Sequence, residues 1–282
     1  MILVTGADGQ LGAEFINTSL RDQIVATTKN ELDISSKQDI EAFCLSNSIK
    51  VIINCAAYTQ VDLAEDQKEE AILVNQVAVK NLVEVCKEQS IFLIHFSTDY
   101  VFDGSKNVPY IESDLESPTS VYGKSKLQGE VEVKSSGIDA AVFRLSWVYS
   151  NRGKNFLLTM LRLGEQQETL SVVFDQVGTP TYTKDVAEIV SKHLDQIRSI
   201  KGVEVFHLSN EGVCSWYDFA QAIFIESGLK TLVKPIRSSE FPSRVQRPHY
   251  SVLDKSKIKA FLNIQIPHWR ESLIQCLKER SL

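Results

Sequence analysis

The sequence has few cysteines, and no pattern among them indicates a disulfide framework or a zinc site. Its 282 residues include five cysteines, an odd number, which are widely scattered and form no Cys-x-x-Cys pair. The five histidines show no metal-ligand spacing either. The residue pattern therefore predicts no metal site, and a protein of the reducing cytoplasm.

Long apolar runs and an excess of positive charge are also missing. No apolar run reaches the roughly 18 residues that a membrane-spanning helix needs. Met1 is followed directly by three apolar residues and a glycine turn, whereas a signal peptide has a basic start and a longer apolar core. The formal net charge is -6, and nucleic-acid binding usually calls for a basic patch. We therefore expect neither a membrane nor a nucleic acid as a partner.

The sequence alternates between short apolar strands and amphipathic helices. With 43% hydrophobic and 23% charged residues, its composition is ordinary for a globular protein. Helical patterns, among them 36–47 and 66–89, separate five strand-like runs at 1–5, 23–28, 51–55, 91–96 and 140–145. This order favours right-handed parallel crossovers. It predicts an α/β fold with a Rossmann-type doubly wound parallel sheet.

The first strand leads into a glycine turn at 6–12, Gly-Ala-Asp-Gly-Gln-Leu-Gly. A helix should follow, with Leu11, Phe15 and Leu20 on its apolar side. Glycines let the backbone approach a pyrophosphate, and the helix N-terminus offers free N–H groups. The spacing is Gly-x-x-Gly-x-x-Gly rather than Gly-x-Gly-x-x-Gly. The turn predicts dinucleotide binding, with a plain strand-to-helix turn as the alternative.

The end of the second strand bears on the choice of cofactor. A carboxylate there would accept the 2'-hydroxyl of NAD, whereas a basic group accommodates the 2'-phosphate of NADP. The sequence at 27–30 is Thr-Thr-Lys-Asn, and Glu31 and Asp33 come slightly later. This favours NADPH with Lys29 near its phosphate, unless Lys29 is simply solvated.

A tyrosine and a lysine at Tyr122 and Lys126 share one face of a predicted helix. A phenol has a pKa of about 10, and a nearby ammonium lowers it. Such a pair could pass a proton to a substrate oxygen. Thr98 follows a strand whose end lies at the same sheet edge as the glycine turn. Taken alone, the Tyr-x-x-x-Lys spacing could equally be an exposed helix turn.

The glycine turn, the segment Ser-Thr-Asp-Tyr at 97–100 and the Tyr-x-x-x-Lys pair together resemble the extended short-chain dehydrogenase/reductase family. Within it, the chain is similar to the dTDP-4-dehydrorhamnose reductases over nearly its whole length. Seven segments carry this similarity: 97–104, 122–130, 146–149, 155–156, 175–176, 178–181 and 247–248. The resemblance implies NAD(P)H-dependent reduction of the C4 keto group of dTDP-4-dehydro-L-rhamnose to give dTDP-L-rhamnose, a polysaccharide precursor.

The resemblance also implies roles for the matching residues. Tyr122 would protonate the C4 oxygen and Thr98 would hydrogen-bond it, while Lys126 would lower the tyrosine's pKa and hold the nicotinamide ribose. Implied cofactor contacts are Gly6, Gly9, Gln10, Leu11, Gly12, Asp33, Ile34, Ala56, Ala57 and Tyr58, beside Lys29. Implied substrate contacts are Thr98, Asp99, Trp147, Asn155 and Arg247.

The second half of the chain should form the substrate side. We assign 1–150 to the NAD(P)-binding domain, with part of 170–210 returning to it, and 151–282 mainly to a smaller C-terminal α/β substrate lobe. The loop 238–250 should close over the substrate. Arg152 and Lys154 are candidates for its diphosphate, or belong to a solvated loop. Trp147 could be a rim or core aromatic, and Trp216 and Phe219 are expected in the core.

Several alternatives stay open at this point. The resemblance allows NADH beside NADPH, and a magnesium ion without assignable ligands. The protein could be a monomer or a homodimer. It could also be another nucleotide-sugar epimerase or reductase of the superfamily, or a non-catalytic subunit resembling the beta subunit of methionine adenosyltransferase.

Overall fold

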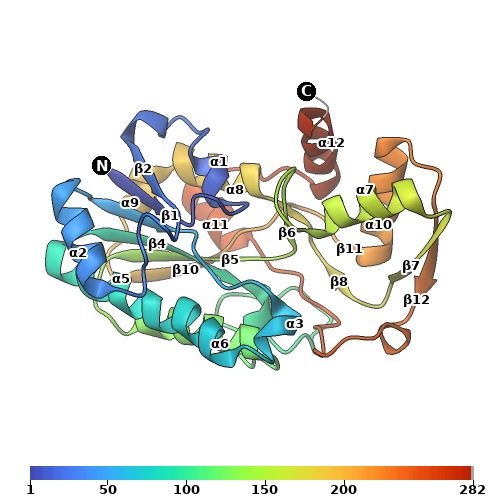
Figure 1. Ribbon diagram of the computed structural model, residues 1–282, viewed down its shortest axis with the longest axis horizontal. Coiled ribbons are helices and arrows are strands. Elements are labelled where there is room, and N and C mark those ends of the chain that lie inside the picture. The colour runs from blue at the N-terminus through green and yellow to red at the C-terminus, as the bar shows by residue number, and fades with distance from the viewer. Residues whose placement is uncertain (281–282) are drawn as a thin grey trace.

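The computed structural model describes residues 1–280, which form a six-stranded parallel sheet and a smaller lobe beside it (Figure 1). The strand order is β10-β5-β4-β3-β1-β2, and each neighbouring pair is parallel. The strands are β1 Ile2–Thr5, β2 Ile24–Thr27, β3 Val51–Asn54, β4 Phe92–Thr98, β5 Ala140–Leu145 and β10 Val203–His207. The chain order reverses between β1 and β3, which is the switch point where such sheets bind ligands.

Helices cover both faces of the sheet, which confirms the expected doubly wound α/β fold. One face carries α2 Lys37–Ser46, α5 Ala78–Gln89 and α6 Val121–Lys134. The other carries α1 Gly12–Phe15, α8 Thr183–Lys192, α9 Leu194–Arg198 and α11 Ser256–Leu262. Successive residues of β1 alternate between the two cores, with Leu3 in one and Val4 in the other. Burial on both faces explains why these strands are continuously apolar.

Two helices differ from their sequence patterns. The helix after the glycine turn ends at Phe15, because Asn17 and Thr18 turn their side chains back onto the carbonyls of Ala13 and Phe15. A short 3-10 helix, η1 Arg21–Gln23, follows. The helix expected over 66–89 is divided into α4 Lys68–Ile72, a π-helical turn η2 Leu73–Val77, and α5. The π turn lets Asn75 bind the backbone N–H and carbonyl of Tyr58.

The smaller lobe has its own apolar core around Tyr149, Tyr182 and Phe219. Its helices are α7 Phe156–Gln166, α10 Trp216–Ser227 and α12 Trp269–Arg280, beside the parallel pair β7 Thr169–Val173 and β12 Leu232–Ile236. Short elements complete the chain: α3 Val61–Ala64, η3 Asp99–Val101, β6 Val148–Tyr149, β8 Val177–Gly178, β9 Thr181–Tyr182, β11 Cys214–Ser215 and η4 Ser238–Glu240. The chain returns to the main sheet with α8, α9, β10 and α11. A domain boundary near residue 150 stays a prediction.

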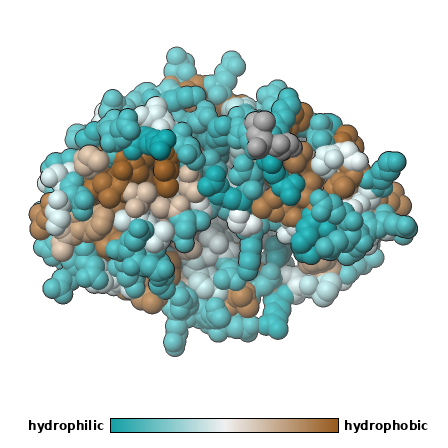
Figure 2. Space-filling model, turned by 45° about the horizontal axis from the view of Figure 1, so that its top comes forward, coloured by the Kyte–Doolittle hydropathy of each residue, from teal (hydrophilic) through white to brown (hydrophobic). Residues whose placement is uncertain are grey.

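The face of the molecule in Figure 2 is mostly hydrophilic, with its hydrophobic residues in scattered patches. Within residues 1–280, no helix combines the length and the apolar character needed to cross a membrane.

A buried ion pair joins α6 to β5. Arg144 is fully buried and donates from Nε and Nη2 to the carboxylate of Glu130, at 3.0 and 2.7 Å. Nη2 also donates to Glu116 at 2.6 Å. Because both Arg144 and Glu130 are removed from water, each depends on the other for its charge to be tolerated.

We predict that Glu130→Gln lowers the free energy of unfolding by about 3 kcal/mol, because it leaves a buried guanidinium with one carboxylate fewer. Urea denaturation measures this loss. The control is Lys201→Gln, which breaks the exposed Lys201–Asp139 pair and should cost less than about 1 kcal/mol. Equal costs for the two variants would contradict the assigned importance of the buried pair.

Candidate active site

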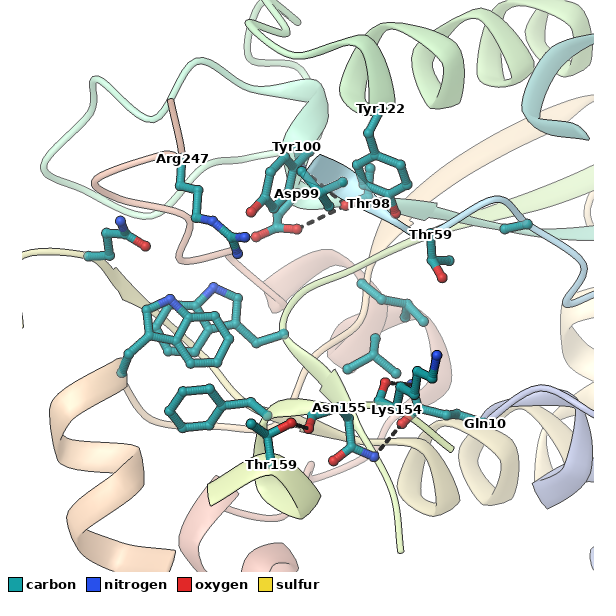
Figure 3. Close-up of a pocket in the computed structure, with 18 of the residues that line it drawn as sticks. Gln10, Thr59, Thr98, Asp99, Tyr100, Tyr122, Lys154, Asn155, Thr159 and Arg247 are labelled. Atoms are coloured by element: carbon teal, nitrogen blue, oxygen red, sulfur yellow. Dashed lines mark hydrogen bonds between the residues drawn. The ribbon is translucent and has the colours of Figure 1, made fainter. Parts of the chain in front are cut away.

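A cavity of about 740 Å³ opens at the carboxyl ends of the strands, between the sheet and the smaller lobe (Figure 3). It brings together many residues that the sequence singles out. Those lining it are Gly9, Gln10, Leu11, Ala57, Thr98, Asp99, Tyr122, Lys126, Trp147, Lys154, Asn155 and Arg247. Segments far apart in the chain therefore meet at the sheet edge expected from the strand order.

Tyr122 lies at the start of α6, close to Thr98 at the end of β4 (Figure 3). Ser120 caps the helix by accepting a hydrogen bond from the N–H of Gly123 at 3.1 Å. Thr98 Oγ1 donates to Asp99 Oδ1 at 3.0 Å. Burial raises the pKa of Asp99 to about 6, and hydrogen bonds from Ser251 and Thr98 oppose this rise.

The side chain of Lys126 reaches β4, where Nζ donates to the carbonyl of Phe96 at 2.6 Å. Burial lowers its pKa to about 8. The expected lowering of the pKa of Tyr122 by Lys126 is not seen. Burial raises the pKa of Tyr122, the hydrogen bond with Thr98 opposes the rise, and desolvation prevails.

A second cavity of about 330 Å³ lies along the glycine turn and the end of β2. It is lined by predicted cofactor residues: Gly6, Gly9, Lys29, Asp33, Ile34, Ala56, Ala57 and Tyr58. The two cavities share Gly9, Cys55, Ala57 and Thr59. Burial raises the pKa of the Cys55 thiol, which lies where the cavities meet.

The glycine turn fits an extended dinucleotide in this paired cavity. Gly6 has φ +64°, and a Cβ there would lie 2.8 Å from the Cα of Ala56. A Cβ at Gly12 would lie 2.2 Å from the carbonyl oxygen of Gly6. Gly12 lines neither cavity and instead allows the turn to close. Glycine is therefore required at both positions for the turn to pack against β3 and close on itself, which places its backbone at the edge of the smaller cavity. Among residues 1–280 there is no group of three or more His, Cys, Asp or Glu side chains that could hold a metal ion, so the structure offers the magnesium ion no site of this kind.

Two stacked indoles form a wall of the larger cavity. Trp147 and Trp216 lie parallel, with ring centroids 3.5 Å apart and planes 5° apart. Gly178 makes room for this stack, since a Cβ there would lie 2.4 Å from Cε2 of Trp147. Trp216, expected in the core, is partly buried, packs against the core of the smaller lobe and also lines the cavity, whereas Phe219 is fully buried as expected. Helical periodicity could not separate the two.

Ion pairs tie the segment 238–250 to α3 and to the turn that follows this helix. Arg247 Nη2 donates to Asp62 at 2.6 Å, and Arg244 Nη1 donates to Asp66 at 2.5 Å. Arg247 and Phe241 line the cavity. Arg152 does not line it and lies 3.7 Å from Glu14 instead. Gln176, from a segment that carries the family resemblance, also lines the cavity, as do Thr59, Thr159 and Phe241, to which sequence reasoning assigned no role because their types carry no particular signal.

Comparisons with known proteins agree with this arrangement. The whole chain, residues 1–282, matches the family model described as the RmlD substrate binding domain. The spore coat polysaccharide biosynthesis protein SpsK of Bacillus subtilis is 39% identical, over 99% of this chain and 98% of SpsK.

Solved structures of dTDP-4-dehydrorhamnose reductases are closely similar. That from Clostridium acetobutylicum has a TM-score of 0.94 at 38% identity, over 100% of this chain and 99% of that chain. That from Bacillus anthracis, in complex with NADP, has a TM-score of 0.91 at 34% identity, over 99% of this chain and 98% of that chain. The resemblance drawn from the motifs is confirmed. The chain belongs to the RmlD substrate binding domain family, together with relatives named dTDP-4-dehydrorhamnose reductase.

Proposed function

We propose that the protein reduces the C4 keto group of dTDP-4-dehydro-L-rhamnose to give dTDP-L-rhamnose, with NADPH as the preferred reductant and NADH also accepted. One observation carries the proposal. Thr98, Tyr122 and Lys126 line a cavity that joins a second cavity built around the glycine turn. A proton donor therefore lies where a keto sugar and a dinucleotide can meet. The free cysteines are consistent with a cytoplasmic enzyme.

The chain's own residues handle the proton and the charge. A bound nicotinamide supplies the hydride to C4. Thr98 Oγ1 orients the keto oxygen, and the Tyr122 hydroxyl gives its proton to that oxygen as it becomes an alkoxide. The raised pKa of Tyr122 keeps the phenol protonated before the reaction, as reduction requires. An alkoxide is a stronger base than a phenolate, so the transfer stays favourable. Lys126, whose Nζ donates to the carbonyl of Phe96, would hold the ribose of the nicotinamide beside this pair.

The rest of the cavity suits a sugar nucleotide, with Arg247 beside Asp99 and Tyr100 and Lys154 beside Gln10 (Figure 3). Stacked Trp147 and Trp216 offer an apolar wall, and Lys154 and Arg247 supply positive charge for a diphosphate. Lys29 lines the smaller cavity, where it supports NADPH through the 2'-phosphate.

Consumption of NADPH with enzymatically prepared dTDP-4-dehydro-L-rhamnose tests the proposal directly. Protein that retains stoichiometric NAD and turns over without added NADPH would indicate an epimerase instead. Protein that binds both ligands without turnover would indicate a non-catalytic subunit.

Tyr122→Phe should lower kcat at least about 100-fold while NADPH binding is retained, because it removes only the hydroxyl that donates the proton. Stopped-flow absorbance and a fluorescence titration with NADPH measure the two quantities. Near-normal turnover in this variant would refute the role of Tyr122.

The value of kcat/KM should fall as pH rises through about 8, because Lys126 carries its proton below this pKa and loses it above. A kcat/KM profile reports groups of the free enzyme. Lys124→Met is the matched control on the same helix, since Lys124 is exposed, and it should leave the profile unchanged. Lys126→Met should abolish the alkaline limb together with most activity. A profile that stays flat to pH 10 would rule out this role for Lys126.

Lys29→Ala should raise the KM for NADPH by about two- to five-fold and leave that for NADH unchanged, because an exposed charge pair contributes up to about 1 kcal/mol. Steady-state kinetics with each cofactor measure the difference. Lys68→Ala serves as the control, because Lys68 is exposed on α4 and lines neither cavity. Equal effects of Lys29→Ala on both cofactors would show that Lys29 does not read the 2'-phosphate.

A further inference from the structure

We propose that Gln10 is a positioning residue that couples the cofactor loop to the substrate wall. Its hydrogen bonds to Ser150, Lys154 and Asn155 are called the Gln10 latch below. Through this latch, a dinucleotide that orders the glycine turn also prepares the cavity for the sugar nucleotide. The identity of the two ligands rests on the proposed function, whereas the latch rests on the contacts themselves.

The latch joins two segments that lie about half the chain apart. Gln10 Oε1 accepts from Asn155 Nδ2 at 2.7 Å (Figure 3) and from Ser150 Oγ at 3.2 Å. Its Nε2 donates to the carbonyl of Lys154 at 3.5 Å. Gly153 has φ +73°, and a Cβ there would lie 3.2 Å from Cγ of Gln10. The side chain of Gln10 is thus held along the whole turn before α7.

Asn155 passes this contact on to α7. Its Oδ1 accepts from the N–H of Leu158 at 3.0 Å, which caps the helix, while its Nδ2 donates to Gln10. Thr159 Oγ1 donates to the carbonyl of Asn155 at 2.8 Å and strengthens the same first turn. One amide therefore both begins the helix and fixes it to the glycine turn.

Helix α7 forms a wall of the larger cavity. Four of its residues line the cavity: Phe156, Thr159, Met160 and Leu163. The ring centroids of Phe156 and Trp216 lie 4.6 Å apart, and Trp216 stacks on Trp147. Displacing the start of α7 would therefore disturb the indole wall as well.

The coupling should be positive, because both ligands would bind against segments that the latch joins. Gly6 and Gly9 line the cofactor cavity and belong to the same turn as Gln10. A dinucleotide that holds this turn in place also holds Gln10 against the start of α7, so a second ligand against α7 should bind more tightly. Because coupling is reciprocal, the second ligand strengthens binding of the first by the same factor.

Calorimetric titrations with dTDP and NADP+ test the latch without turnover. In the wild-type protein, saturating NADP+ should tighten dTDP binding about five-fold or more. Asn155→Ser keeps a good helix cap but removes the amide nitrogen, and Gln10→Leu keeps the size but removes the hydrogen bonds. In both variants the ratio of the dTDP dissociation constants without and with NADP+ should fall to about one. A general loss of stability would not produce this change.

Arg152→Ala is the matched control in the same loop, because the Arg152 side chain pairs with Glu14 and not with Gln10. This variant should keep the wild-type ratio. If both ligands bind to the wild-type protein but NADP+ does not change the dissociation constant of dTDP, the latch is overturned and the proposed function is not. The latch would also be overturned if NADP+ still tightened dTDP binding in Gln10→Leu and Asn155→Ser, or if it no longer did so in Arg152→Ala. Failure of dTDP to bind under any condition would instead remove the proposed function, and the inference with it.

Discussion

Helix α6 lies so close to the neighbouring backbone that two of its positions have no room for a Cβ atom. A Cβ at Gly123 would lie 2.3 Å from the carbonyl oxygen of Tyr100, and one at Gly129 would lie 2.2 Å from that of Asn75. This close packing brings the first turn of α6 against the end of β4. The proximity of Tyr122 to Thr98 therefore depends on two glycines that take no part in chemistry.

The same helix gathers buried charge. Lys126 and Glu130 lie one turn apart on α6, and both are almost fully buried. The carboxylate of Glu130 neutralises the charge of the Arg144 guanidinium directly. It also raises the pKa of Lys126, against the effect of desolvation. Stability and reactivity are thus linked through one carboxylate. A helix that delivers an ammonium to the active site needs such compensation, because an isolated buried charge is very costly.

Local patterns predicted most of the fold and the central part of the site. Continuous apolar runs identified the buried strands, and the spacing of Tyr122 and Lys126 placed both on one helix. The features of the site that the sequence did not predict depend on contacts between distant segments. The position of Trp216 follows from its stacking on Trp147, and the path of segment 238–250 follows from pairs such as Arg247–Asp62. The pKa of Tyr122 follows from burial, which outweighs the spacing that suggested the opposite shift.

Cys55 gives the site a chemical property of another kind. Cys55 lines both cavities where they meet. Thiols react as thiolates, and burial strongly disfavours the thiolate here. The cysteine therefore serves as a small apolar filler beside the reacting groups. The wall shared by the two cavities can in this way contain a thiol that burial keeps in its protonated form.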